Sequence, residues 1–179
     1  MRVDLTPHPT TPAGPVARLE VDVVRTGGRL ALWFCLEHEA SAVVVPPPDQ
    51  GRADELWKDT CFEAFIRAGE GAGYLELNLS PSGRWQVYAF DGERTGMRQA
   101  SLPTPDVRVA EAPGRLAVAA RAELADLPPA DLGWRLGLSA VVRRTDGERS
   151  YWALKHATDK PDFHHPDSFA LTLPAEDAP

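Results

Sequence analysis

The stretch LWKDTCFEAFI, residues 56–66, decides the fold class. From Thr60 onward, an apolar residue at every second position predicts a β-strand that buries one face. The residues predicted to be buried are Phe62, Ala64 and Ile66. The other face carries Asp59, Cys61, Glu63 and Phe65. A carboxylate in the middle of such a strand indicates that this second face meets either water or a ligand.

The same alternation recurs along the rest of the chain. Further runs occupy 16–25, 29–37, 73–80, 84–90, 106–112, 115–124, 133–145, 149–155 and 168–173. Pairs such as Gly27-Gly28, Pro113-Gly114 and Asp146-Gly147 separate neighbouring runs and predict hairpin turns. Proline is confined to the loops, and helix is expected only as about one turn within 122–132. We therefore predict an all-β fold, an antiparallel two-sheet β-sandwich of jelly-roll type with little helix.

The length and composition predict one ordinary globular domain. The chain has 179 residues, of which 43% are hydrophobic and 25% charged. A chain of this length fits a single domain with its own core. Residues 1–15, rich in proline and threonine, are expected to form an N-terminal arm, and residues 16–179 the domain itself.

Charge and targeting signals exclude several classes of partner. The formal net charge is −7, which argues against nucleic acid or an anionic membrane surface as the main partner. No run is long enough to span a membrane, and MRVDLTPHPTTPAGP (1–15) lacks the apolar region of a signal peptide. We expect a cytoplasmic protein in which Cys35 and Cys61 stay reduced. The oligomeric state is left open.

The strands predict a core and an opposite polar face. The predicted core comprises Phe62, Ile66, Leu75, Leu77, Leu79, Leu136, Leu138 and Leu154. The opposite face combines carboxylates, amides, guanidinium groups and aromatic rings, which suits a polar ligand but also describes an ordinary solvated face. The candidate ligand-binding residues are Trp57, Lys58, Glu63, Glu76, Asn78, Tyr88, Arg143, Trp152, Lys155 and His164. Trp57 and Trp152 are each a candidate for stacking on a sugar ring or for packing in the core.

Part of this pattern resembles a known family. Trp57, Asp59, EAFI (63–66), YLELNLSP (74–81) and Gly83 follow the order seen in family 9 carbohydrate-binding modules and their relatives in the DOMON superfamily. The likeness is nearest to the stand-alone DOMON-like proteins of bacteria. It implies a jelly-roll sandwich that binds a saccharide or, in other branches, haem.

The resemblance also implies roles for particular residues. Sugar-binding members clamp a terminal sugar between two tryptophans, and Trp57 matches the first, with Trp152 as a candidate for the second. The structural calcium ligands of the family are not placed in this chain. Haem-binding members use methionine with histidine or lysine. Here only Met97, within the predicted turn 91–99, follows the initiator methionine, so we expect no haem and no other cofactor.

Two further constellations leave alternatives open. Residues 155–169 hold His156, His164 and His165 with three aspartates, which favours ligand contact or loop anchoring over a metal site. Glu63 and Glu76 are predicted on adjacent strands, where two carboxyl groups share a proton, support glycoside hydrolysis, or pair with Lys58, Arg143 or Lys155. The function that the sequence favours is a non-catalytic module that binds a saccharide or a related small polar ligand. A structural or protein-interaction sandwich, a haem-binding redox module and an enzyme are the alternatives.

Overall fold

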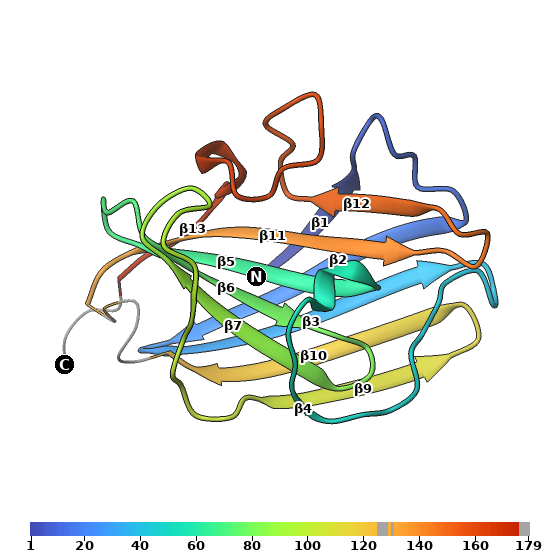
Figure 1. Cartoon of the computed structure of the whole chain (residues 1–179), viewed down its shortest axis with the longest axis horizontal. Helices are drawn as coiled ribbons and strands as arrows, with labels where there is room; N and C mark the ends of the chain where they lie inside the picture. The colour runs from blue at the N-terminus through green and yellow to red at the C-terminus, as the bar shows by residue number, and fades with distance from the viewer. Residues whose placement is uncertain (125–128, 130, 176–179) are drawn as a thin grey trace.

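The computed structural model describes residues 1–124, 129 and 131–175, and their regular secondary structure is almost entirely β (Figure 1). The strands are β1 Arg2–Pro7, β2 Val16–Thr26, β3 Arg29–His38, β4 Gly51–Arg52, β5 Cys61–Ala68, β6 Tyr74–Leu79, β7 Arg84–Phe90, β8 Arg98–Gln99, β9 Asp106–Ala112, β10 Arg115–Glu123, β11 Trp134–Arg143, β12 Arg149–Ala153 and β13 Leu171–Leu173. Two single turns of 3-10 helix, η1 Leu56–Lys58 and η2 Pro166–Ser168, are the helical elements of the described residues. The predicted all-β class with little helix is confirmed, and none of the described helices is long and apolar enough to cross a membrane. The helical turn expected within 122–132 falls mainly on 125–128 and 130, outside the described residues.

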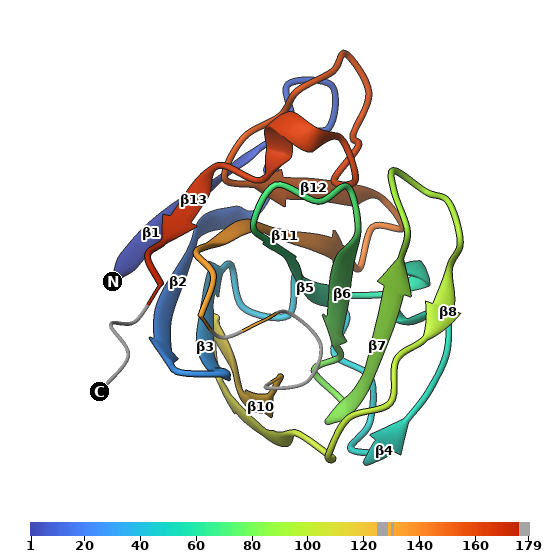
Figure 2. The ribbon, with the colours of Figure 1, turned by 90° about the vertical axis from the view of Figure 1, so that its left-hand side faces the viewer.

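Hydrogen bonds connect the strands into one curled sheet. The order is β4-β7-β6-β5-β11-β12-β1-β2-β3-β10-β9, with β13 paired to β11 and β8 to β7. All of these pairs are antiparallel except β4 with β7. Seen end-on, β2 and β3 lie on one side of the curl, and β5, β6 and β7 on the other (Figure 2).

Strand β1 joins the two halves of the curled sheet, and it lies in the segment 1–15 that was predicted to form an N-terminal arm. Residues 2–5 pair with β2, whereas Thr6 and Pro7 pair with β12. The strand thus exchanges one neighbour for another part-way along, which joins the two halves. A separate pair of sheets stays a prediction, because the hydrogen bonding shows one continuous path.

The main core lies inside the curl. The rings of Phe34 in β3 and Phe62 in β5 meet there with their centroids 5.2 Å apart. Seven of the eight predicted core residues are buried in this cluster, and they are Phe62, Ile66, Leu75, Leu77, Leu79, Leu136 and Leu138. Leu154 is only partly buried because it follows the last residue of β12.

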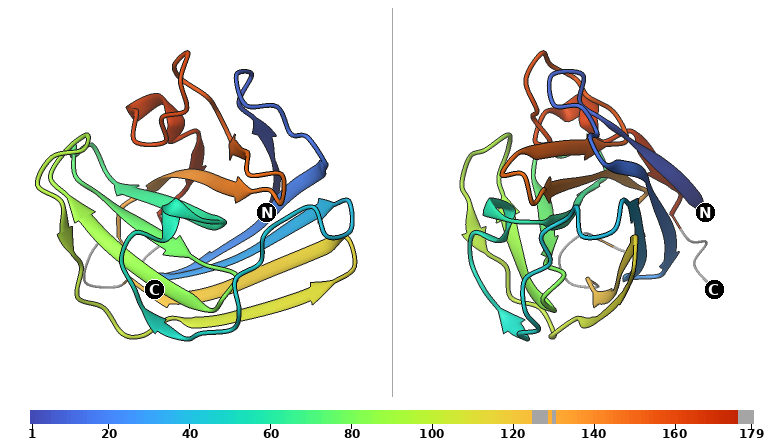
Figure 3. Two further views of the ribbon diagram at one scale, coloured as in Figure 1. Left: turned by 45° about the vertical axis from the view of Figure 1, so that its right-hand side comes forward. Right: turned by 90° about the vertical axis from the view of Figure 1, so that its right-hand side faces the viewer.

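A second, smaller cluster covers the outer face of β5, β6, β7, β11 and β12. It contains Phe65, Tyr74, Tyr88, Phe90, Val141, Ala153, Phe163 and Phe169. The last two come from the segment between β12 and β13, which stands on the outside of the curl (Figure 3). Consequently every residue of β6, and most of β5, is buried on one face or the other.

Candidate functional site: a cavity above two buried glutamates

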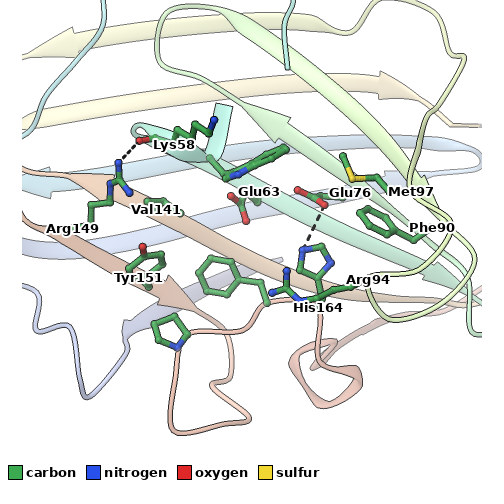
Figure 4. A pocket seen from close by; sticks show the side chains of 13 residues that line it. Lys58, Glu63, Glu76, Phe90, Arg94, Met97, Val141, Arg149, Tyr151 and His164 are labelled. Atoms are coloured by element: carbon green, nitrogen blue, oxygen red, sulfur yellow. Dashed lines mark hydrogen bonds and ion pairs between the residues drawn. The ribbon is translucent and has the colours of Figure 1, made fainter. Parts of the chain in front are cut away.

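A cavity of about 610 Å³ opens on this outer face (Figure 4). The sheet forms its floor, and the turn 91–97 and the segment 156–169 form part of its wall. It is lined by Trp57, Lys58, Glu63, Glu76, Phe90, Arg94, Met97, Val141, Arg149, Tyr151, Pro161, Phe163 and His164. This volume lies within the range of roughly 300–1,000 Å³ that is typical of small-molecule sites.

The carboxyl groups of Glu63 and Glu76 face this cavity from the sheet (Figure 4). Glu63 lies in the middle of β5, opposite Asn78 of β6, and Glu76 lies two residues from Asn78 along β6. The two glutamates are therefore diagonal neighbours on one face. They are only 3% and 4% exposed, because the outer loops cover the strands that carry them.

Neutral groups hold both carboxyls in place. The Ser139 hydroxyl donates to Glu63 Oε2 over 3.2 Å, and the Asn78 amide donates to Glu76 Oε1 over 2.8 Å. Burial, together with the charge of Glu76, raises the pKa of Glu63 to about 8. Burial also raises the pKa of Glu76. Glu63 is thus mainly protonated at neutral pH.

The basic residues that were candidates for pairing with these glutamates have other partners. Lys58 pairs with Glu55 at 2.6 Å, Arg143 with Asp59 at 3.0 Å, and Lys155 with Asp167 at 3.6 Å. The sequence left open whether Glu63 and Glu76 pair with these cations or have raised pKa values. The contacts of the described residues favour raised pKa values.

His164 connects the floor to the loops. Its Nδ1 lies 2.7 Å from the hydroxyl of Tyr74, which also accepts the backbone N–H of Arg94 over 3.2 Å. When the phenol donates to Nδ1, the proton of the imidazole lies on Nε2, which faces Glu76 Oε2 at 3.8 Å. Burial and the charge of Arg94 lower the pKa of His164 to about 4, so the ring is neutral at neutral pH.

An ion pair holds the two loops together beside this histidine. The guanidinium of Arg94 donates to Asp162 Oδ1 over 2.7 Å, and the same oxygen accepts the backbone N–H of His164 over 3.1 Å. Arg94 adopts a left-handed backbone conformation with φ of 51°. The ion pair between Arg94 and Asp162 connects the turn 91–97 to the segment 156–169 at the wall of the cavity.

Aromatic rings form much of the remaining wall. Trp57, half-buried in η1, meets the ring of Tyr88 edge-on with centroids 5.7 Å apart. Tyr151 of β12 and Phe163 lie with their centroids 6.2 Å apart. Buried carboxyls beneath flat apolar rings make a site that is polar at its floor and apolar along its sides.

The fold is similar to that of solved carbohydrate-binding proteins. A candidate carbohydrate-binding protein from Bacteroides uniformis aligns with a TM-score of 0.62 and 15% identity, over 84% of this chain and 75% of that one. A family 9 carbohydrate-binding module from Caldicellulosiruptor kristjanssonii in complex with cellotriose aligns with a TM-score of 0.52 and 8% identity, over 85% of this chain and 69% of that one. The glucose complex of a family 9 module from the same organism has the same TM-score and identity, over 90% of this chain and 78% of that one. No protein-family model matches the chain, and no curated protein matches it significantly by sequence.

Half of the ten sequence-predicted site residues line the cavity. These are Trp57, Lys58, Glu63, Glu76 and His164. Asn78 and Tyr88 lie behind them, the first bonded to Glu76 and the second donating its hydroxyl to Asp54 over 2.7 Å. Arg143 and Lys155 are exposed and do not line the cavity.

The placement of Trp152 corrects the role considered for it. This residue is 3% exposed, lies in the main core, and donates its indole N–H to Ser150 Oγ. Alternate residues of a strand face opposite sides, so Trp152 points inward where Tyr151 points outward. The ring that β12 presents to the cavity is therefore that of Tyr151.

Eight lining residues were not among the ten candidates chosen from the sequence. Strand alternation was enough to find Phe90, Val141 and Tyr151, which share the parity of other outward-facing residues on their strands. Arg149, the first residue of β12, has the same parity as Tyr151. The others lie in loops whose position no local pattern predicts, and they are Arg94, Met97, Pro161 and Phe163.

The described residues contain no group of histidine, cysteine and carboxylate side chains arranged to hold a metal ion. His165 accepts the backbone N–H of Asp167, and His156 faces the carbonyl of Thr6 at 2.8 Å. Both contacts anchor the loop. Burial raises the pKa of the Cys61 thiol well above its ordinary value, which keeps it protonated.

Proposed function

We propose that this protein is a non-catalytic carbohydrate-binding module that holds a saccharide in the cavity above Glu63 and Glu76. The observation that carries the proposal is the combination, in one cavity of about 610 Å³, of two buried carboxyls with aromatic walls. A sugar ring has apolar C–H faces and a rim of hydroxyls, so it needs flat rings beside it and hydrogen-bonding groups at its edge. Trp57 and Tyr151 supply the flat rings, and Glu63 and Glu76 supply the hydrogen-bonding groups.

The fold and the motif support the same assignment. The neighbours that share the fold include family 9 modules in complex with cellotriose and with glucose. The stretch from Trp57 to Gly83, which resembles these modules and their DOMON relatives, runs through η1, β5 and β6. These are the elements that carry Trp57, Glu63 and Glu76 to the cavity.

The fold neighbours favour binding over hydrolysis, since they are carbohydrate-binding proteins and modules. Burial raises the pKa values of both Glu63 and Glu76. The basic side chain that lies within 4 Å of either carboxyl among the described residues is His164, which is neutral. The haem alternative gains no support from His164, since its two ring nitrogens already face Tyr74 and Glu76.

Calorimetric titration with glucose, cellotriose and a panel of other mono- and oligosaccharides tests the proposal. We expect at least one to bind, and Trp57→Ala to weaken that binding about tenfold or more, the scale for loss of a well-packed contact. Trp33→Ala is a matched control, because Trp33 is 53% exposed and lies on β3, away from the cavity. The proposal fails if no saccharide binds the wild type, or if Trp33→Ala removes the binding and Trp57→Ala does not.

A further inference from the structure

Among the described residues, neither glutamate of the cavity forms an ion pair with a charged base. Glu63 bonds to the neutral Ser139 through Oε2, and Glu76 bonds to the neutral Asn78 through Oε1. His164 Nε2 lies 3.8 Å from Glu76 Oε2 and is itself neutral. The charge of Arg94 favours the ionised form of both carboxyls from a greater distance, and its ion pair is with Asp162. Burying a carboxyl without a counter-charge costs free energy, and a bound cation that pairs with the carboxyl offsets this cost.

Of the three lysine and arginine side chains that line the cavity in the described part of the chain, two are paired with carboxylates. Lys58 pairs with Glu55, and Arg94 pairs with Asp162. The exposed guanidinium of Arg149 donates to the carbonyl of Lys58 over 2.7 Å (Figure 4). Other described titratable groups that interact with the glutamates are Cys61, Tyr74 and Tyr88, whose pKa values burial raises, so they stay neutral. The deepest charge-bearing groups of the cavity are therefore acidic.

We propose that the ligand is an amine-bearing saccharide whose protonated amine sits at Glu63 and Glu76, an inference that rests on the proposed function of the cavity. A cation placed there makes charge-assisted hydrogen bonds to groups that now have only neutral partners. The rings of Trp57 and Tyr151 attract the same cation through their faces when it lies over them. A neutral sugar makes the ring contacts but brings no positive charge to the carboxyls.

Binding of the amine changes the protonation of the floor. At neutral pH Glu63 carries its proton in the empty cavity. The incoming ammonium group stabilises the carboxylate, so that Glu63 releases this proton to solvent while the amine keeps its own. The heat of binding should then depend on the ionisation enthalpy of the buffer, with up to one proton released for each ligand bound.

Titrations with glucosamine, glucose and N-acetylglucosamine test this inference. Glucose lacks the amine. N-acetylglucosamine keeps the sugar ring, but acetylation removes the positive charge of the amine. We expect glucosamine to bind about tenfold or more tightly than either, with proton release, since hydrogen bonds to charged groups stabilise more than neutral ones. Glu63→Gln and Glu76→Gln should reduce this preference, whereas Glu123→Gln, the same substitution on the distant β10, should leave it unchanged.

The outcomes separate the two proposals. If glucose binds as tightly as glucosamine, the amine inference is overturned and the saccharide site stands. If choline binds as tightly as glucosamine, the site recognises a cation rather than a sugar. If none of a broad saccharide panel binds, the proposed function fails, and this inference fails with it. A preference for glucosamine that persists in both glutamine variants places the amine elsewhere and overturns the assignment of its partners.

Discussion

Replacing Glu63 by glutamine tests the protonation of the cavity floor directly. The pKa of Glu63 is about 8 in the folded protein, compared with an ordinary value of 4.5. A carboxyl whose pKa is raised on folding binds its proton more tightly in the folded state. Its contribution to stability is therefore fully present below about pH 4.5 and is lost progressively as the pH rises to about 8.

The magnitude follows from this interval. Neutral pH lies about 2.5 units above the ordinary value, and each unit corresponds to about 1.4 kcal/mol, so Glu63 lowers the free energy of unfolding by about 3 kcal/mol there. Glutamine has almost the same shape and still accepts the hydrogen bond of Ser139. Glu63→Gln should thus stabilise the protein by about 3 kcal/mol at neutral pH and change little below about pH 4.5.

Urea unfolding across a series of pH values measures this difference. Glu123→Gln, at an exposed position on β10, is the control and should give no comparable gain. A Glu63→Gln variant that is less stable than the wild type at neutral pH would refute the reasoning. A loss of stability means that Glu63 is ionised and held by a partner. A gain that does not shrink as the pH falls would also refute the reasoning, because such a gain does not arise from the raised pKa of Glu63.

Three further predictions follow from the packing and the site. Leu77→Ala should lower the free energy of unfolding by about 2–5 kcal/mol, because Leu77 is fully buried in the main core; unchanged urea unfolding would mean that the faces of β6 are misassigned. Trp152→Ala should cost about 3–5 kcal/mol in the same assay and act through stability; weaker saccharide binding in a variant of wild-type stability would contradict its place in the core. The imidazole of His164 should stay neutral in NMR titrations down to about pH 5 and protonate near 4, so its contribution to stability is lost as the pH falls from about 6.5 to 4; a midpoint near 6.5 would show that it is not buried.

Local pattern was sufficient for the strands and for most of the core. An apolar residue at every second position places Leu75, Leu77 and Leu79 on one face whatever the rest of the chain does, because side chains alternate along an extended backbone. Glycine pairs such as Gly27-Gly28 similarly set the hairpins, since a tight turn needs backbone angles that glycine adopts freely. The outward position of Glu63 and Glu76 follows from the same rule.

Only the tertiary structure decided what surrounds those glutamates. Arg94 and His164 come from loops whose course depends on long-range packing, and Lys58, Arg143 and Lys155 each pair with a carboxylate that alternation does not identify. The amino-acid sequence by itself thus determined which residues face outward and that a carboxylate lies among them. Whether that face meets water or is enclosed depends on contacts between residues far apart in the chain, and these contacts bury Glu63 and Glu76, raise their pKa values and make the cavity.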